Sequence, residues 1–120
     1  MTSKKILVAD DDPAIVDSLQ LILELANYKV CTTINGKVIA MLKREKPDLL
    51  LLDIWMSGVD GRDICKKLKA NEQTKNIPVI MISATRDIER STKESGADDF
   101  LEKPFEMDEL LEKVEKYTCP

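Results

Sequence analysis

Three consecutive aspartates follow the first apolar run of the chain, and a fourth aspartate follows a later run. Asp10, Asp11 and Asp12 come directly after one run, and Asp53 ends another. Carboxylates about 4 Å apart repel by roughly 4 kcal/mol at an effective dielectric constant of 20, so such a cluster needs a proton or a cation. A hard, oxygen-binding cation such as Mg²⁺ meets that need. Asp12 can equally be a helix cap and the others solvated loop acids, so the acidic run alone leaves both interpretations open.

Two other polar side chains stand at the ends of later apolar runs. Ser83 ends the fourth run and Lys103 follows the fifth. Each by itself is explained as well by a strand-end cap or a surface charge. Together with the aspartates they supply a hydroxyl and an ammonium group, and this set suits phosphoryl transfer to an aspartate. A metal ion and a lysine would neutralise the phosphoryl oxygens while a carboxylate attacks in line.

Five short apolar runs predict the strands that position these groups. They are Ile6–Ala9, Val30–Ile34, Leu49–Leu52, Val79–Ile82 and Phe100–Leu101. The third and fourth are wholly apolar, as is typical of strands covered on both faces. Because helical patterns alternate with the runs, right-handed crossovers would give a parallel sheet in a three-layer α/β sandwich. Active groups gather at the carboxyl ends of such strands, so we expect Asp10, Asp11 and Asp53 at one edge.

Helix boundaries are marked by residues with known preferences. Asp12 is a good N-cap, with Pro13 at the first helical position. The second helix should follow a turn at Asn35-Gly36 and end before Pro47, whose ring discourages helical geometry at Lys46. A third helix should open at Gly61 or the residue after it.

The last two helices differ in their apolar content. Apolar residues recur at helical spacing over Met107–Tyr117, which predicts the final helix. The segment Asp87–Ser95 has almost no apolar side chain beyond Ile88. Packing is expected to hold this fourth helix only weakly and to make it the most mobile one.

Length, charge and cysteine usage exclude several classes of protein. The chain has 120 residues, which fits one domain over residues 1–120. Its 18 basic and 22 acidic residues give a net charge of -4, the wrong sign for direct nucleic-acid binding. The longest apolar runs fall far short of the ~20 residues that span a bilayer, so we expect no membrane segment. Three cysteines without metal-site spacing favour free thiols in a reducing cytoplasm.

Missing residue types exclude further chemistry. The chain has no histidine, which removes Ser-His and Cys-His catalysis, HExxH zinc sites and an internal imidazole base. Its four glycines are too few and too scattered for a dinucleotide fingerprint or a Walker loop.

Four sequence blocks in this order resemble the receiver domain of two-component response regulators, close in size to the stand-alone chemotaxis type. They are ILVADDDP at 6–13, LLLLDIWMSGVDG at 49–61, PVIMISA at 78–84 and GADDFLEKPF at 96–105. The resemblance implies a flavodoxin-like (βα)5 fold, a doubly wound five-stranded parallel sheet with strand order 2-1-3-4-5.

The resemblance also implies a metal site and a phosphoacceptor. Asp53 matches the acceptor, Asp11 a direct Mg²⁺ ligand, and Asp10 its partner, which usually holds a metal-bound water. Trp55 matches the position whose backbone carbonyl binds the metal. Mg²⁺ is the implied cofactor, with Mn²⁺ as a substitute.

Three further positions match the family's switching residues. Ser83 matches the hydroxyl that turns towards the phosphoryl group, Lys103 the lysine that contacts it, and Phe100 the aromatic switch. A cis peptide bond between Lys103 and Pro104 is also implied.

The sequence departs from the family pattern at several places. Met56-Ser57 stands where Met-Pro is usual, and Phe100 replaces the frequent tyrosine and so lacks its hydroxyl. Trp55 and Thr85 occupy variable positions where side chains tune dephosphorylation.

For the partners, the resemblance implies a histidine kinase or histidine phosphotransfer protein as phosphoryl donor, and a downstream protein target or effector domain. Phosphorylation would bias a surface formed by the fourth helix, fifth strand and fifth helix. We expect a monomer or a weak, phosphorylation-dependent dimer, located in the cytoplasm.

Other functions stay open at this point. A pseudo-receiver adaptor would work without phosphorylation. A Mg²⁺-dependent aspartyl-phosphate phosphatase generally has an acid two residues after its nucleophile, where this chain has Trp55. A flavodoxin-like cofactor binder would need a phosphate-binding loop after the first strand, where three acids would repel a phosphate.

Overall fold

The five apolar runs form one parallel sheet in the computed structural model, which describes residues 3–34, 37–56, 58–84 and 88–119. Its strands are β1 (Lys5–Ala9), β2 (Lys29–Thr33), β3 (Leu49–Asp53), β6 (Val79–Ser83) and β7 (Asp99–Glu102). They lie in the order β2-β1-β3-β6-β7, with every neighbouring pair parallel. Counted along the chain, this is the order 2-1-3-4-5, so the predicted doubly wound fold is confirmed.

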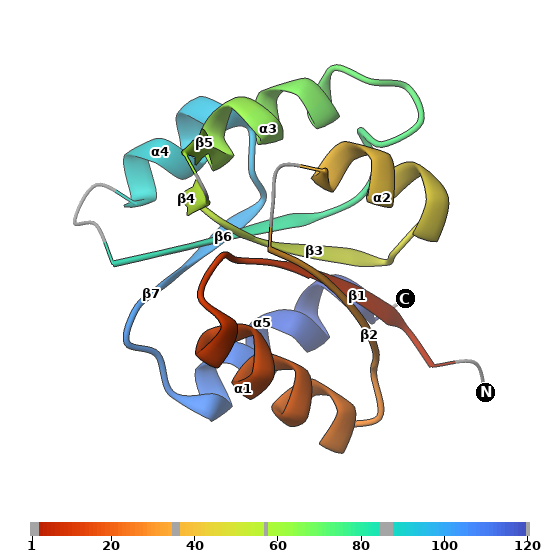
Figure 1. Cartoon of the computed structure of the whole chain (residues 1–120), viewed down its shortest axis with the longest axis vertical. Helices are drawn as coiled ribbons and strands as arrows, with labels where there is room; N and C mark the ends of the chain where they lie inside the picture. The colour runs from red at the N-terminus through yellow and green to blue at the C-terminus, as the bar shows by residue number, and fades with distance from the viewer. Residues whose placement is uncertain (1–2, 35–36, 57, 85–87, 120) are drawn as a thin grey trace.

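Five helices cover the two faces of the sheet (Figure 1). They are α1 (Pro13–Leu25), α2 (Val38–Glu45), α3 (Gly61–Lys69), α4 (Ile88–Ser95) and α5 (Met107–Thr118). Helices α1 and α5 lie on one face, and α2, α3 and α4 lie on the other. None of the helices in the described part of the chain is long and apolar enough to cross a membrane.

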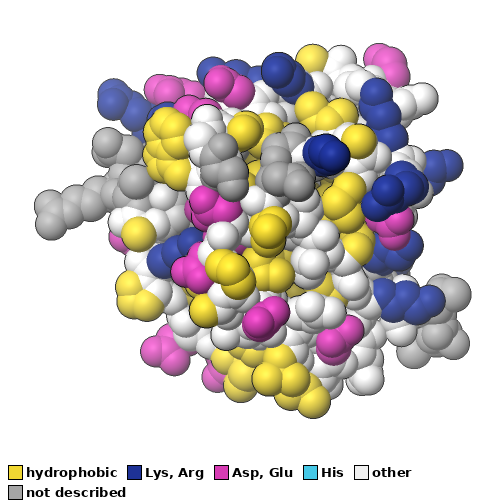
Figure 2. Space-filling view, viewed as in Figure 1, with side chains coloured by type: hydrophobic (Ala, Val, Ile, Leu, Met, Phe, Trp, Pro, Cys, Tyr) yellow, Lys and Arg dark blue, Asp and Glu magenta, His cyan; other side chains and the backbone are white. Residues whose placement is uncertain are grey.

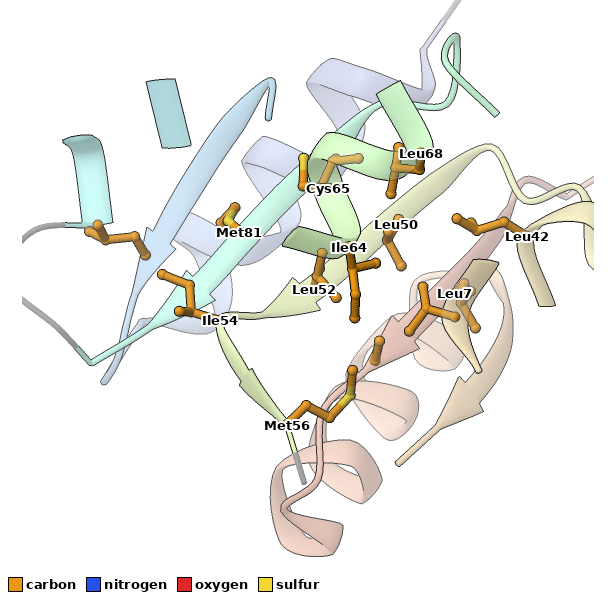
Figure 3. Packing of buried hydrophobic residues seen from close by; sticks show 14 residues of the cluster. Leu7, Leu42, Leu50, Leu52, Ile54, Met56, Ile64, Cys65, Leu68 and Met81 are labelled. Atoms are coloured by element: carbon orange, nitrogen blue, oxygen red, sulfur yellow. The ribbon is translucent and has the colours of Figure 1, made fainter. Parts of the chain in front are cut away.

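The core is divided between the two faces because successive strand side chains point in opposite directions. Leu50 packs with the α2–α4 layer, whereas Leu49 and Leu51 pack with α1 and α5. Figure 3 shows the first of these clusters, in which side chains of the sheet meet side chains of α2 and α3: Leu7, Leu50, Leu52, Met81, Leu42, Ile64 and Leu68. Every residue of β3 and β6 is buried, as their wholly apolar runs predict.

The register of the strands fixes where the polar residues emerge. Ala9 of β1 lies opposite Leu52 of β3, so the residues that follow them leave the sheet at the same edge. Ser83 of β6 lies opposite Glu102 of β7, which places the next residue, Lys103, at this edge too. The sheet therefore gathers all of these groups at its carboxyl edge.

Helix ends follow the predicted signals. The Asp12 side chain accepts a hydrogen bond from the N–H of Ala14 at 3.0 Å and caps α1. Helix α2 ends at Lys46, whose φ of 47° lies in the left-handed region, so its departure from α-helical geometry is confirmed. Helix α3 opens at Gly61, and its N-cap is Asp60.

A pair of two-residue strands was not predicted from the sequence. Strands β4 (Trp55–Met56) and β5 (Val59–Asp60) form a two-stranded antiparallel sheet directly after β3. Two residues are too few for any periodic pattern, so nothing in the hydrophobic spacing indicates the pair. The ends of β2 and β7 also differ from the predicted runs by one residue, and β1, which pairs with Lys29–Thr33 over its whole length, explains the shift in β2.

Helix α4 does have a packing face, although it is poor in apolar residues. Ile88, Ser91, Thr92 and Ser95 are buried at helical spacing. The hydroxyl of Thr92 donates to the Ile88 carbonyl at 2.7 Å, so the buried hydroxyl is satisfied within the helix itself. The mobility of this helix stays a prediction. Four other predicted features, at Asn35-Gly36, Ser57, Thr85 and Asp87, lie outside the described residues.

Candidate functional site

Three of the predicted acids come together at the carboxyl edge of the sheet. One oxygen each of Asp10, Asp11 and Asp53 lies within 4.8 Å of the others. Asp10 follows β1 and is 1% exposed, Asp53 ends β3 and is 8% exposed, and Asp11 is exposed. Two buried carboxylates and one accessible carboxylate therefore share a small volume that opens to solvent on the Asp11 side.

A single lysine balances part of this negative charge. The Lys103 ammonium donates to Asp10 Oδ2 at 3.0 Å and lies 3.7 Å from Asp53 Oδ1. Its backbone is fixed as well, because the Lys103 N–H donates to the Ser83 carbonyl at 2.8 Å. The following bond to Pro104 is cis, as the sequence resemblance implies.

The pKa of Asp53, the residue that ends β3, is higher than that of a free carboxyl group. Burial and the neighbouring charge of Asp10 raise the pKa of Asp53 to about 6, from 3.8 for a free carboxyl. Lys103 and the backbone N–H of Trp55 act in the opposite direction and favour the ionised form. Asp53 is thus an anion above pH 6, in surroundings that do not fully compensate its charge, and an added cation would lower its pKa.

Asp10 is held by two donors from different parts of the chain. Its Oδ1 accepts from the N–H of Asp12 at 3.0 Å, and its Oδ2 accepts from Lys103. Both of its oxygens are therefore oriented before any ligand binds. Asp11, the exposed member, reaches solvent, and this arrangement leaves an all-oxygen donor set that fits a hard divalent cation.

Comparison with known proteins decides the family. The model of the response regulator receiver domain matches residues 6–115, which include all of the acids and Lys103. The chain belongs to this family.

Several receiver domains and response regulators resemble the chain over most of its length. It is 42% identical over 113 residues to RpaA of Synechocystis, a DNA-binding dual master transcriptional regulator, covering 92% of this chain and 47% of RpaA. The receiver domain of a signal transduction histidine kinase from Syntrophus aciditrophicus is 32% identical, with a TM-score of 0.89 over 97% of this chain and 90% of that one. Chemotaxis protein CheY4 of Vibrio cholerae is 25% identical, with a TM-score of 0.88 over 97% and 99%. The chain spans less than half the length of RpaA.

In this receiver domain, Ser83 lies close to the acids and Phe100 lies further along β7. Ser83 is buried at the end of β6, beside the end of β3, where Asp53 is paired with Ile82. Phe100 is half-buried on β7 and packs against the α2–α4 side of the core. The ammonium of Lys113 lies 5.3 Å from the centre of the Phe100 ring. The structure thus brings Ser83 to the acidic edge and places Phe100 on the α2–α4 side of β7, where the Lys113 ammonium of α5 reaches its ring.

Trp55 stands at the rim of the receiver's acidic edge. Its indole is 54% exposed, while its backbone N–H bonds the Asp53 carboxylate. The Arg62 guanidinium lies 5.7 Å from the indole centre and is held by Asp60 through contacts of 2.7 to 3.1 Å. The sequence analysis did not predict the contact between Arg62 and Trp55. An acid two positions before an arginine at the start of a helix could have indicated that Arg62 is held by Asp60. An exposed aromatic side chain thus lies next to the end of β3, with a guanidinium group over its ring.

Proposed function

We propose that this receiver domain accepts a phosphoryl group on Asp53 from a phosphohistidine of a histidine kinase or histidine phosphotransfer protein, in a Mg²⁺-dependent step. The observation that carries the proposal is the cluster of Asp10, Asp11 and Asp53, two of which, Asp10 and Asp53, lie 3.0 Å and 3.7 Å from the Lys103 ammonium. No histidine occurs in this sequence, so the phosphohistidine must lie outside it.

The metal site would use the oxygens of the acidic cluster. We assign Asp11 and Asp53 as direct ligands, Asp10 as the group that orients a metal-bound water, and the Trp55 carbonyl as a further ligand. The two donors that hold Asp10 support its indirect role, since they fix its carboxylate in place. Bound Mg²⁺, or Mn²⁺ in its place, would offset the charge of the acids and of the phosphoryl oxygens.

In the transfer step, an oxygen of the Asp53 carboxylate attacks the phosphorus of the phosphohistidine. An O–P bond forms as the N–P bond breaks, and the leaving imidazole nitrogen keeps the electron pair. Lys103 stays next to the reacting carboxylate and stabilises the charge of the phosphoryl oxygens. Above pH 6 Asp53 is ionised and needs to lose no proton before it attacks.

The new charge would then be transmitted to the surface formed by α4, β7 and α5. Ser83 turns towards the phosphoryl group, and Phe100 repacks beneath Lys113. Two contacts support this route: the backbone of Ser83 bonds Lys103, and Lys113 couples α5 to the ring on β7. The same Lys113 also bonds Asp99 at 2.9 Å. Rearrangement of Phe100 would thus change an ion pair at the surface.

The family match extends over nearly all of the chain, so we propose a single receiver domain across residues 1–120 that acts in the cytoplasm. Its target is a downstream protein or an effector domain, reached as a monomer or as a weak, phosphorylation-dependent dimer. DNA binding belongs to RpaA as a whole and is not assigned to this domain.

The test is the intact mass of the protein after incubation with acetyl phosphate, with and without Mg²⁺. We expect the native chain to gain one phosphoryl group only when Mg²⁺ is present, and Asp53→Asn to gain none. Asp63→Asn is the matched control, because it removes an exposed carboxylate on α3 away from the cluster. If neither acetyl phosphate nor a phosphorylated kinase domain modifies the native chain, the protein is a phosphorylation-independent receiver and the proposal is wrong.

A further inference from the structure

An open cleft lies at the end of α2, away from the acidic edge. It has a volume of about 490 Å³ and is lined by Lys43, Lys46 and Gln73. In a parallel sheet with helical crossovers, each helix runs back towards the amino ends of the strands. The end of α2 therefore lies at the opposite edge from Asp53. Figure 2 shows dark blue Lys and Arg side chains gathered along the right-hand edge of the molecule, on the side where Figure 1 places α2.

The positive charge of this cleft is not balanced by neighbouring acids. Glu45 is bound by Arg44 at 3.1 Å and lies 3.6 Å from the Lys5 ammonium, while Glu72 pairs with Lys75 at 2.9 Å. The carboxylate of Asp48 accepts a hydrogen bond from the Lys5 N–H at 2.8 Å. Lys43 and Lys46 are exposed and form no ion pair with any residue in the described part of the chain. Two ammonium groups thus face solvent while the acids nearest to them in sequence already have other partners.

The backbone at Lys46 adds a second, independent observation. Lys46 has a φ of 47°, which is a left-handed backbone conformation. Residues other than Gly and Asn adopt this conformation at a cost of about 1 kcal/mol. The residues with the same left-handed conformation after α1 and α4 are Asn27 and Gly96. Only α2 among the described helices ends with a lysine in this geometry. Left-handed geometry is a common way to end a helix, so it explains where α2 stops, and the use of lysine at this position supplies one of the two ammonium groups of the cleft.

We propose that the cleft of Lys43, Lys46 and Gln73 binds an acidic segment of a partner protein, separately from phosphorylation. Two ammonium groups match a pair of Asp or Glu carboxylates, and the Gln73 amide can both donate to and accept from a peptide group. A nucleic acid fits less well, since no lining residue is aromatic and bases would have nothing to stack on. The cleft is open rather than enclosed and so suits a chain laid across it.

The experiment is titration of ¹⁵N-labelled protein at low salt with an octaglutamate peptide, followed by amide chemical shifts. We expect shifts confined to residues around 42–47 and 71–75. Each exposed ion pair contributes up to about 1 kcal/mol, so Lys43→Gln and Lys46→Gln should each weaken binding by two- to fivefold. Lys93→Gln on α4 removes the same charge elsewhere, from a side chain that is 79% exposed, and should leave the affinity unchanged.

Lys46→Gly separates docking from a purely structural role. Glycine relieves the left-handed strain, so the variant should be at least as stable as the native chain while binding the peptide more weakly. Equal affinity of this variant and the native chain, or shifts spread away from the cleft, would overturn the proposal. Tighter binding of a single-stranded oligonucleotide than of octaglutamate at equal salt would overturn the choice of an acidic protein segment.

Discussion

The carboxyl edge of the sheet and the opposite edge differ in the sign and the burial of their charged groups. At the carboxyl edge, the two buried carboxylates share one lysine and lie close to a third, exposed carboxylate, and each of these groups is positioned by the end of a strand. At the opposite edge, Lys43 and Lys46 are exposed and lack counter-charges among the described residues. Charges in the first region interact strongly because water is excluded, whereas charges in the second are screened by salt. The first region therefore suits chemistry, and the second suits reversible association.

The largest effect should come from removing Lys103, the cation that pairs with Asp10 and Asp53 in the described part of the chain. Lys103→Met leaves Asp10 and Asp53 uncompensated and removes a donor to the phosphoryl group. We expect phosphorylation by acetyl phosphate to slow by about 100-fold or more, and the pKa of Asp53 to rise above its present value of about 6. Mass spectrometry measures the rate, and carbon-detected NMR titration measures the pKa. Lys113→Met is the control, since it removes a similarly half-buried lysine from another ion pair, that with Asp99; equal slowing in both variants would contradict the assigned role.

The second prediction concerns stability and pH. Because folding raises the pKa of Asp53 from 3.8 to about 6, its ionised form destabilises the native state above pH 6, and this penalty disappears as the pH falls towards 4. Asp53→Asn should therefore increase the free energy of unfolding at pH 7.5 by up to about 3 kcal/mol. The gain should shrink steadily below pH 6. Urea unfolding at pH 7.5, 6 and 4.5 measures it, and a gain independent of pH would show that charge is not the cause.

A third, smaller effect should follow from adding the metal without any phosphoryl donor. Mg²⁺ at ten times its dissociation constant should stabilise the native chain by about 1.4 kcal/mol. Thermal unfolding should show a higher Tm that chelation reverses. Asp11→Asn should lose this increase and Asp63→Asn should keep it. A shift of equal size in Asp11→Asn would place the cation elsewhere.

The smallest effects are expected at the lysine edge. Lys43→Gln should change the free energy of unfolding by less than about 0.5 kcal/mol, as is usual for exposed positions. Lys46→Gly should raise it by about 0.5–1 kcal/mol, because glycine adopts the left-handed conformation without strain. Parallel urea unfolding curves measure both. A clear loss of stability in either variant would mean that these lysines are part of the fold and that the two edges are more alike than we infer.

Much of the fold could be predicted because its signals are local. The apolar run of β3 and the cap at Asp12 each determine their own element, and parallel alternation then decides the edge at which Asp53 emerges. The pairing of Lys103 with Asp10 was harder to predict, since it joins the ends of β1 and β7, which are separated in the sheet by β3 and β6. Sequence order suggested that they share an edge but carried no distance.

Other features could not be predicted because they depend on packing in three dimensions. The β4–β5 pair is shorter than any periodic pattern, so the Arg62–Trp55 contact that it supports was missed. Helix α4 was judged by its apolar content, whereas its buried face is mostly made of small hydroxyl side chains that bond the helix backbone. Hydropathy scores such residues as polar and cannot tell that they are satisfied.

The bond between Lys103 and Asp10 joins residues 93 positions apart. During synthesis, the three aspartates are all made long before their counter-charge, and the acidic edge has no lysine until the last strand has emerged from the ribosome and joined the sheet. A nascent chain that ends before this strand therefore carries all three aspartates without the ammonium group that bonds Asp10 in the folded domain.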